Sequence, residues 1–313
     1  MTKKALICGS IAFDTIMNFE DQFKKHILPD QVHILNVSFL VPRLRKDFGG
    51  CAGNIAYSLH QLGGHAIPMA TVGHDCAVYI DKFSTLGIQT EYLKIIPSEF
   101  TAQAFITTDL DDNQITAFHP GAMNYAHLNT ITSNIDCDLA IIAPDGRQGM
   151  IDHAEQLASL NIPFIFDPGQ GLPMFDGKTL KRFLELATYA AVNDYEAKLL
   201  CEKTNQSLEQ LASTVTALFV TRGAQGSWLF YGNQKYEIPA VKPTQMIDPT
   251  GCGDAYRGGL LFGLLNDLSL QHTAKLASLM GSVKIAYKGG QNYQITASDL
   301  YQRFEKEFGH SPW

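Results

Sequence analysis

The chain has 313 residues, of which 45% are hydrophobic and 18% charged. That composition is typical of a globular protein with one large domain or two ordinary ones, and it excludes a largely disordered chain. The 24 Lys and Arg residues against 31 Asp and Glu give a net charge of −7, so nonspecific binding to nucleic acid or to an anionic membrane has no overall electrostatic support.

The six cysteines have no regular spacing, and no two of them form a C-x-x-C pair. The sequence therefore predicts neither a disulfide framework nor a zinc site, and we expect reduced thiols in a cytoplasmic protein. No apolar run approaches the ~18 residues that span a membrane. We expect no secretory signal, because the N-terminus runs directly into a short apolar stretch that ends at Gly9.

Short apolar runs, several of which stop at Gly, Asp or Asn, recur along the chain, and each has the length of a buried strand. They lie at residues 5–9, 139–143, 163–167, 189–193 and 217–221. Amphipathic stretches between several of them predict helices, at residues 150–160, 178–187 and 196–203. This alternation predicts an α/β fold with a doubly wound, mainly parallel sheet that is covered on both faces.

Two segments break this rhythm, at residues 15–47 and 101–120. The first contains a β-like stretch at residues 32–41. The second has β-branched and aromatic flanks around an Asp- and Asn-rich turn at residues 109–113, which predicts a β-hairpin. These strands form either a small sheet that projects from the main domain or edge strands of the main sheet.

The sequence DPTGCGD at residues 248–254 precedes an apolar run long enough to be a buried helix. Its glycines permit a tight turn that aims free backbone N–H groups and the positive helix end at one point, which makes an anion site. Asp254 beside this turn is either an ordinary helix cap or a base that takes a proton from a hydroxyl attacking a bound phosphate.

Two further segments place polar groups where a ligand can reach them. The sequence GGCAGN at residues 49–54 leads into a predicted helix, and its glycines allow close approach while Asn54 offers a donor and an acceptor. Asp14 follows the carboxyl end of the first strand, where open α/β sheets bind ligands, so it can hold sugar hydroxyls. Each signal taken alone also fits an ordinary loop.

Two common ways of binding a nucleotide are not supported. No G-x-G-x-x-G follows the first strand, which argues against the usual dinucleotide fingerprint. The sequence GKT at residues 177–179 matches the end of a Walker A motif, but Leu172 stands where the upstream glycine is needed. Phosphate chemistry in this chain must therefore use a different cradle.

The two glycine segments together resemble the two signatures of the ribokinase-like (PfkB) sugar and nucleoside kinases. Three further matches support the resemblance: Asp14, the N-x-x-E at residues 193–196 and the glycine-rich TRGAQG at residues 221–226. Pro249 and Cys252 stand where the family often has Thr and Ala. The resemblance spans the chain and implies one ribokinase-like kinase domain over its full length, in which the two irregular segments form a β-lid over the substrate.

Three segments are more similar to bacterial adenosine and nucleoside kinases than to ribokinase or phosphofructokinases: FHPGAM at 118–123, FDPGQ at 166–170 and GGQN at 289–292. The resemblance therefore implies an ATP-dependent nucleoside kinase that phosphorylates the ribose 5′-hydroxyl, with adenosine as the first candidate. A kinase of another nucleoside or of a free sugar is the alternative. A nucleoside-binding module without turnover and a nucleotide-dependent oxidoreductase are more distant readings.

The resemblance also implies roles for individual residues. The proton acceptor and the phosphoryl-stabilising turn are Asp254, Gly251, Cys252 and Gly253. Nucleoside contacts are expected from Ser10, Asp14, Gly50, Asn54, Phe39, Phe105, Phe118 and Gln170. ATP contacts are expected from Asn193, Thr221, Arg222, Gly223, Gly226 and Gln291. Mg²⁺ would be reached through water by Asn193 and Glu196.

Several points stay open at this stage. The lid aromatics either stack on a purine base or only pack the lid sheet. Arg257, one turn into the helix, either contacts phosphate or is a solvated helix residue. A monovalent cation such as K⁺ near Asp248 and Thr250 is implied by the family alone. We expect nucleoside and ATP as partners, without nucleic acid or membrane, and the chain is either a monomer or a homodimer.

Overall fold

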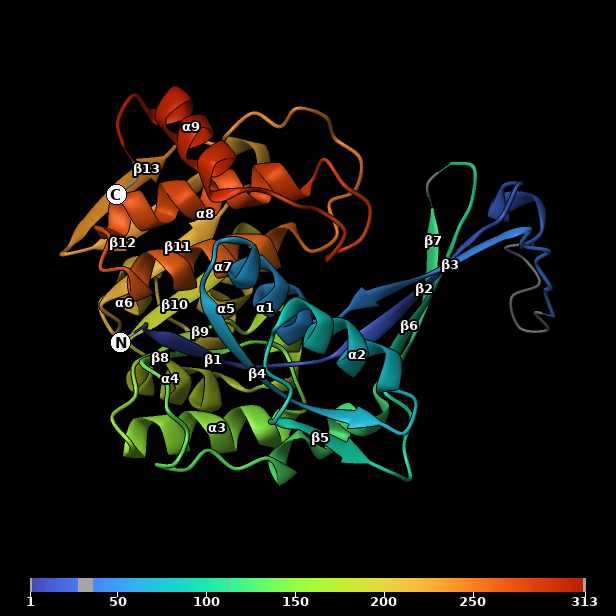
Figure 1. The fold of residues 1–313 in the computed structure, drawn as a ribbon, viewed down its shortest axis with the longest axis horizontal. Coiled ribbons are helices and arrows are strands. Elements are labelled where there is room, and N and C mark those ends of the chain that lie inside the picture. The colour runs from blue at the N-terminus through green and yellow to red at the C-terminus, as the bar shows by residue number, and fades with distance from the viewer. Residues whose placement is uncertain (1, 28–35, 112, 312–313) are drawn as a thin grey trace.

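The structure, a computed structural model, describes residues 2–27, 36–111 and 113–311. These residues form a nine-stranded main sheet with the strand order β13-β12-β11-β10-β9-β8-β1-β4-β5 (Figure 1). Its strands are β1 (Lys4–Cys8), β4 (His65–Gly73), β5 (Leu93–Ile96), β8 (Leu139–Ile142), β9 (Phe164–Phe166), β10 (Tyr189–Asn193), β11 (Ala217–Thr221), β12 (Ser227–Tyr231) and β13 (Gln234–Ile238). The sheet is parallel from β5 to β11, and β12 and β13 continue it antiparallel.

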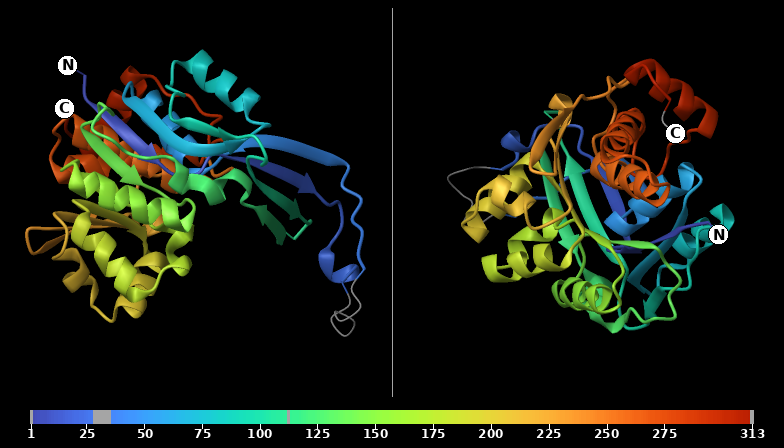
Figure 2. Two further views of the ribbon diagram at one scale, coloured as in Figure 1. Left: turned by 90° about the horizontal axis from the view of Figure 1, so that it is seen from below. Right: turned by 90° about the vertical axis from the view of Figure 1, so that its left-hand side faces the viewer.

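Helices cover both faces of this sheet (Figure 2). One face carries α1 (Cys51–Gln61), α2 (Ala77–Leu86), α7 (Cys252–Leu265) and α8 (Leu270–Lys284), with α9 (Ala297–Phe308) outside α8. The other carries α3 (Arg147–Ser159), α4 (Gly177–Leu186), α5 (Asp194–Thr204) and α6 (Leu208–Ala212). Short 3₁₀ turns complete the chain: η1 (Phe23–Lys25), η3 (Gly121–Leu128), η4 (Gly169–Met174) and η5 (Gly223–Gln225).

Strand β1 shows why the predicted strands read as continuous apolar runs. Its side chains alternate between the two faces, so Ala5 and Ile7 enter the core beneath α1 and α7, whereas Leu6 and Cys8 enter the core beneath α3 and α4. Both faces of the sheet are thus buried. The doubly wound α/β prediction is confirmed, and the three predicted helices correspond to α3, α4 and α5.

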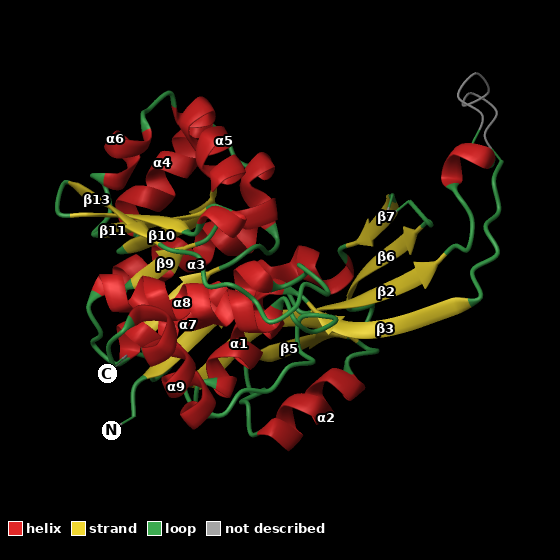
Figure 3. Ribbon diagram, turned by 90° about the horizontal axis from the view of Figure 1, so that it is seen from above, coloured by secondary structure: helices red, strands yellow, loops and turns green. Residues whose placement is uncertain are grey.

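A second sheet of four strands among the described residues projects from the main domain, in the order β3-β2-β6-β7 (Figure 3). It consists of β2 (Ala12–Asn18), β3 (Arg43–Gly49), β6 (Ala102–Thr108) and β7 (Gln114–His119). The separate lid sheet and its hairpin are confirmed, so the edge-strand alternative is wrong. The first segment's strand lies at β3 and not at residues 32–41: residues 36–41 are irregular, and 32–35 lie outside the described residues.

The order of the main sheet reverses between β1 and β8, because the chain builds outward from β1 to β5 and then returns to β8. Ligands of open α/β sheets bind at the carboxyl ends of the strands beside such a switch point. The lid strands β2 and β3 continue from this same edge, since β2 begins four residues after β1 ends and β3 leads directly into α1. In the described part of the chain, no helix has the length and apolar character to cross a membrane.

Candidate active site

A left-handed glycine begins helix α7. Gly251, at φ 76°, is the N-cap of the helix, a conformation that side chains with a Cβ rarely adopt. The backbone amide of Cys252 donates to the Pro249 carbonyl at 3.1 Å, so it is used within the turn. The prediction that the Cys252 amide stabilises a phosphoryl group is therefore wrong in this arrangement. The next amides, at Gly253 and Asp254, belong to the first helical turn, whose N–H groups have no intrahelical acceptor.

Asp254 lies half-buried in that first turn. Desolvation raises the pKa of its carboxyl from 3.8 to about 7, and the charges of Asp167 and Asp14 act in the same direction. A hydrogen bond from Asn54 Nδ2 to Asp254 Oδ2, at 2.8 Å, opposes the shift. A carboxylate with a pKa near neutrality is well suited to accept a proton at physiological pH.

The side-chain amide of Asn54 is itself oriented by a hydrogen bond. Gln291 Nε2 donates to Asn54 Oδ1 at 3.1 Å, which turns the amide nitrogen of Asn54 toward Asp254. Gln291 is buried and also donates to the Tyr79 hydroxyl, so it positions Asn54 and lies outside the lining of the nucleotide-sized cavity described next. The prediction that Gln291 contacts ATP is therefore replaced by a role at Asn54.

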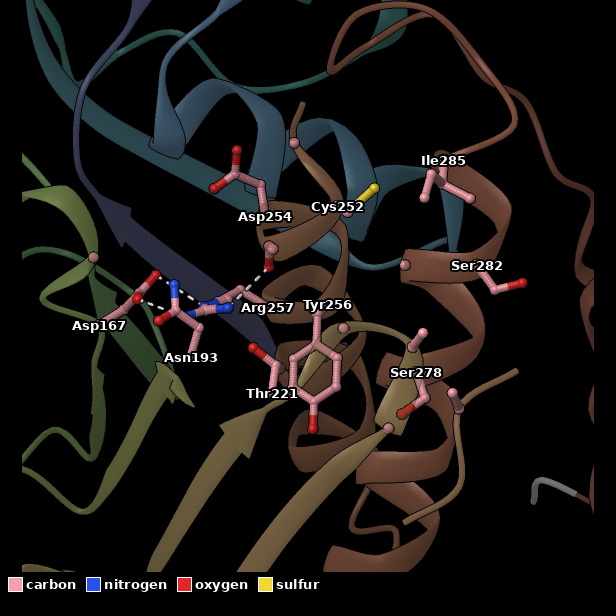
Figure 4. A pocket seen from close by; sticks show the side chains of 18 of the residues that line it. Asp167, Asn193, Thr221, Cys252, Asp254, Tyr256, Arg257, Ser278, Ser282 and Ile285 are labelled. Atoms are coloured by element: carbon pink, nitrogen blue, oxygen red, sulfur yellow. Dashed lines mark hydrogen bonds and ion pairs between the residues drawn. The ribbon is translucent and has the colours of Figure 1, made fainter. Parts of the chain in front are cut away.

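A cavity of about 510 Å³ opens on the Asp254 side of α7 (Figure 4). It collects residues that the sequence predicts for catalysis, ATP and Mg²⁺: Gly251, Cys252, Gly253, Asp254, Asn193, Glu196, Thr221, Gly223 and Gly226. Gln170, predicted for the nucleoside, lines the same cavity. These residues come from the carboxyl ends of β10 and β11 and from the start of α7, so one edge of the sheet assembles the cavity.

Arg222, like Gln291, is predicted to contact ATP but does not line this cavity. Its guanidinium lies 4.2 Å from the centre of the Trp228 ring, and it donates to the Gln225 carbonyl at 3.0 Å. Arg222 therefore stabilises the loop between β11 and β12, and its ATP contact stays a prediction.

Arg257 proves to be neither solvated nor free to bind phosphate. Its guanidinium is buried and pairs with Asp167 through Nε–Oδ2 at 3.1 Å and Nη2–Oδ1 at 2.9 Å (Figure 4). Burial works against its charge, but Asp167 and Glu196 raise the pKa of Arg257 above its usual value. The pair ties α7 to the end of β9 beneath the cavity.

On the lid side, Asp14 stands beside the glycine turn of α1. Burial raises the pKa of Asp14 to about 6, helped by Asp47 and Asp248 and opposed by Arg45. Gly50, at φ 87°, begins α1, and the Ser10 hydroxyl accepts the Cys51 amide at 3.1 Å. Gly50 and Ser10 thus shape the turn next to which Asp14 lies.

The strand register decides which lid residues share the Asp14 face. Asp14 is opposite Ala104, and Ala104 is opposite Phe118, so Phe118 lies on that face. Ile16 and Ile106, two residues further along, lie there too. Phe105 lies on the reverse face, so the prediction that it contacts the nucleoside is wrong in this arrangement.

Phe39 lies beyond the outer end of the lid sheet. Its ring packs against Phe19, Phe23 and His26, with ring centres 4.8 to 6.3 Å apart. Phe39 therefore packs the tip of the lid and does not reach the Asp14 face, which corrects its predicted nucleoside contact.

Sequence reasoning missed an ionic link between the lid and the loop before α7. Arg45 on β3 lies 3.5 Å from Asp248 and 3.0 Å from Asp47. Asp248 also accepts the amides of Thr250 and Gly289 at 2.9 Å each. Arg45 and Asp47 lie two residues apart in β3 and share a face of the lid, but no sequence pattern relates either of them to Asp248.

A family model described as pfkB family carbohydrate kinase matches residues 14–297. The chain belongs to the PfkB family. Among curated relatives of this PfkB protein, the nucleoside kinase of Methanocaldococcus jannaschii is 31% identical over 307 residues, which are 97% of both chains.

Solved structures agree with this PfkB assignment. The nucleoside kinase of Burkholderia thailandensis in complex with inosine is 54% identical, covers 98% of this chain and 99% of its own, and has a TM-score of 0.89. The same Burkholderia protein in complex with ADP-inosine is 56% identical, covers 98% of this chain and 97% of its own, and has a TM-score of 0.87. The ribokinase-like fold with a four-stranded lid is thereby established for this chain.

Proposed function

We propose that this PfkB protein is an ATP-dependent nucleoside kinase that phosphorylates the ribose 5′-hydroxyl of purine nucleosides, adenosine first among them. The observation that carries the proposal is the position of Asp254. It lines the cavity formed by the predicted nucleotide residues and is hydrogen-bonded to Asn54 on the side where Asp14 stands. The raised pKa of Asp254 and its position between the proposed nucleotide site and the proposed sugar site support its role as the base.

In this reaction Asp254 accepts the proton of the 5′-hydroxyl while that oxygen attacks the γ-phosphorus. The new bond joins the 5′-oxygen to phosphorus, the bond from phosphorus to the β,γ-bridging oxygen breaks, and ADP leaves. The amides of Gly253 and Asp254, at the positive end of α7, stabilise the charge on the phosphoryl oxygens. Asn54 keeps the carboxylate oriented, and Asp14 accepts hydrogen bonds from the ribose hydroxyls.

Mg²⁺ fits the residues at the cavity floor as a hydrated ion. Asn193 and Glu196 line the cavity, where each uses one side-chain oxygen to cap α5. In the described part of the chain, no group of three or more His, Cys, Asp or Glu residues is arranged to hold a metal directly. Asn193 and Glu196 would therefore hold the ion through water, and it would neutralise charge on the β- and γ-phosphates.

The lid favours a nucleoside over a free sugar. Phe118, 52% exposed, lies with Ile16 and Ile106 on the face that carries Asp14. An apolar surface beside the sugar-binding carboxylate suits a base, which would bury it, whereas a free pentose would leave it facing water. Inosine is the second candidate because the Burkholderia relative was solved with inosine.

A substrate panel tests the proposal. Chain, ATP and Mg²⁺ are incubated with adenosine, inosine, guanosine, cytidine, ribose or fructose, and the phosphorylated products are separated by chromatography. We expect kcat/KM for adenosine and inosine to exceed that for ribose by about 10²-fold or more, since the base contributes binding that ribose lacks. A preference for a free sugar would overturn the nucleoside assignment, and binding of adenosine without turnover would make the chain a binding module.

A further inference from the structure

Lys284, the last residue of α8, is a fully buried lysine next to the active-site turn. Its exposed fraction is 0%, and its ammonium donates to the Asp248 carbonyl at 2.7 Å and to the Tyr287 carbonyl at 3.1 Å. Among the ion pairs within 4.0 Å in the described residues, none includes Lys284. A buried positive charge thus rests on two main-chain carbonyl oxygens, which is an unusual set of partners.

Capping of α8 does not account for this placement. A lysine near a helix C-terminus commonly donates to the carbonyls of its own helix end, and the Tyr287 contact fits that description. The Asp248 carbonyl, however, belongs to the segment before α7, 36 residues earlier in the chain. Lys284 therefore joins two loops, residues 245–251 and 285–291, both of which border the site.

The two loops are also joined by their backbones. The amides of Ile247 and Asp248 donate to the Ile285 carbonyl at 2.9 and 3.1 Å, and the Gly289 amide donates to Asp248 Oδ2 at 2.9 Å. A Cβ on Gly251 would lie only 3.0 Å from the Gly290 Cα. A cation at this junction therefore controls where the turn that begins α7 is placed.

The oxygens around Asp248 do not fit an additional monovalent ion. Its carbonyl accepts the Lys284 ammonium, while its carboxylate accepts two backbone amides and faces Arg45 at 3.5 Å. The K⁺ ion that the family resemblance implies near Asp248 would thus compete with the covalently attached charge of Lys284 for the same carbonyl oxygen and would also meet the guanidinium of Arg45.

We propose that the Lys284 ammonium takes the place of a monovalent cation, so that the chain positions the turn at the start of α7 with an internal charge and needs no K⁺ for turnover. The proposal rests on the proposed kinase function. Lys284 is a positioning residue, since it acts on the Asp248 carbonyl and through it on the turn that carries Asp254. Burial lowers the pKa of Lys284, and the nearby Asp248 and Asp254 carboxylates act against that shift.

The first test uses the unmodified chain in two salts. Turnover of adenosine is measured in potassium chloride and in choline chloride at a matched ionic strength of about 0.1 M, with ATP and buffer as Tris salts. Products are separated by chromatography, because a pyruvate kinase coupling system itself needs K⁺. We expect kcat and the unfolding midpoint each to be the same in both salts. A kcat at least tenfold higher in potassium chloride would overturn the proposal.

The second test removes the ammonium. We expect Lys284→Ala to lose about 10- to 100-fold in kcat, the usual range for a hydrogen bond to a charged group, with a nucleoside KM that changes less than threefold. Potassium or methylammonium should then restore part of kcat and raise the unfolding midpoint of this variant. Lys284→Met, which keeps most of the side-chain volume, should show the same loss and no rescue by methylammonium.

Lys203 provides a matched control, because its ammonium also bridges two carbonyls, those of Pro173 and Phe175 at 3.2 and 2.8 Å, away from the site. Lys203→Ala should keep its turnover and respond to neither cation. Full activity in both Lys284 variants, or a loss that no cation restores in a folded Lys284→Ala, would refute the positioning role. If Lys284→Ala does not fold, the two-salt comparison decides alone. A chain inactive in every salt would instead contradict the proposed function.

Discussion

Replacing Asp254 by asparagine distinguishes the two hypotheses for this residue, a catalytic base and a helix cap. Asparagine has the same shape, and its Oδ1 can accept the hydrogen bond that Asn54 Nδ2 gives to Asp254 at 2.8 Å. The variant therefore keeps the local geometry and loses the ability to take a proton. General-base catalysis contributes about 10²- to 10⁴-fold, so we expect kcat to fall by that factor, which corresponds to about 3–5 kcal/mol in the barrier.

The raised pKa of Asp254 gives the same prediction a pH dependence. With a pKa of about 7, the carboxylate is about one-tenth ionised at pH 6, half at pH 7 and nine-tenths at pH 8. Turnover of the unmodified chain should therefore rise roughly tenfold from pH 6 to pH 8, and the residual turnover of Asp254→Asn should not follow this curve.

The stability of the fold shows whether the Asp254→Asn variant is folded. In the unmodified chain it should fall as pH rises, whereas turnover should increase. A carboxyl whose pKa is raised from 3.8 to about 7 on folding costs stability progressively as pH increases between about 4 and 7, because the folded state holds the proton more tightly. Asp254→Asn removes that cost, so at pH 8 its unfolding midpoint should equal or exceed that of the unmodified chain. Loss of turnover in this variant then cannot be attributed to unfolding.

The assay follows AMP formation from adenosine by chromatography between pH 6 and 8, with Asp176→Asn as the matched control. Asp176 caps α4 by accepting the Thr179 amide at 2.8 Å, and asparagine caps helices equally well. Asp176→Asn should therefore change neither turnover nor its pH profile. If Asp254→Asn behaves like this control and keeps near-normal turnover, Asp254 is only a cap and the mechanism proposed above is refuted.

Three further outcomes follow from other contacts. Discrimination between adenosine and 2′-deoxyadenosine should be about 1–3 kcal/mol in kcat/KM and should narrow in Asp14→Ala; equal efficiency in the unmodified chain would remove Asp14 from the sugar site. Hydrogen exchange in the β2 and β6 amides should slow on adding adenosine while β8 barely changes, and protection confined to β8 would argue against the lid. Arg257→Met should cost about 3–5 kcal/mol in unfolding free energy by leaving Asp167 buried without its partner; a variant of unchanged stability would contradict this pairing.

The main sheet could be predicted from the sequence because each parallel strand is buried on both faces. Residues 189–192 and 217–220 are apolar without interruption, and the strands predicted at residues 189–193 and 217–221 have the predicted ends. The lid strands were harder to predict, because half-exposed strands have only a weak hydrophobic pattern. The first lid segment was predicted as β-like at residues 32–41, but its strand is β3, Arg43–Gly49, in which Arg45, Lys46 and Asp47 are consecutive and break any alternation of polar and apolar residues.

The glycine turn was predictable because its spacing constrains the backbone, whereas the charged residues around it were not. Arg257 follows Asp254 by three residues, which suits a solvated helix face as well as a site. Its burial depends on Asp167, 90 residues earlier in the chain. The roles of Gln291 and Lys284 likewise depend on contacts with residues 237 and 36 positions away, and no local pattern carries that information.

In the proposed mechanism, the base Asp254 and the nucleoside that accepts the phosphate are held by different parts of the molecule, and this division bears on how hydrolysis of ATP would be avoided. The hydrogen bond between Asn54 and Asp254 joins α1 to α7, two helices of the main domain, so this contact of the proposed base does not involve the lid. Asp14 and Phe118 belong to the lid sheet. If Asp254 is the base, a water molecule that reached it would lose its proton to this carboxylate just as the ribose hydroxyl would. Selection of the acceptor over water therefore falls to the lid, which must exclude water from a base that is already in place.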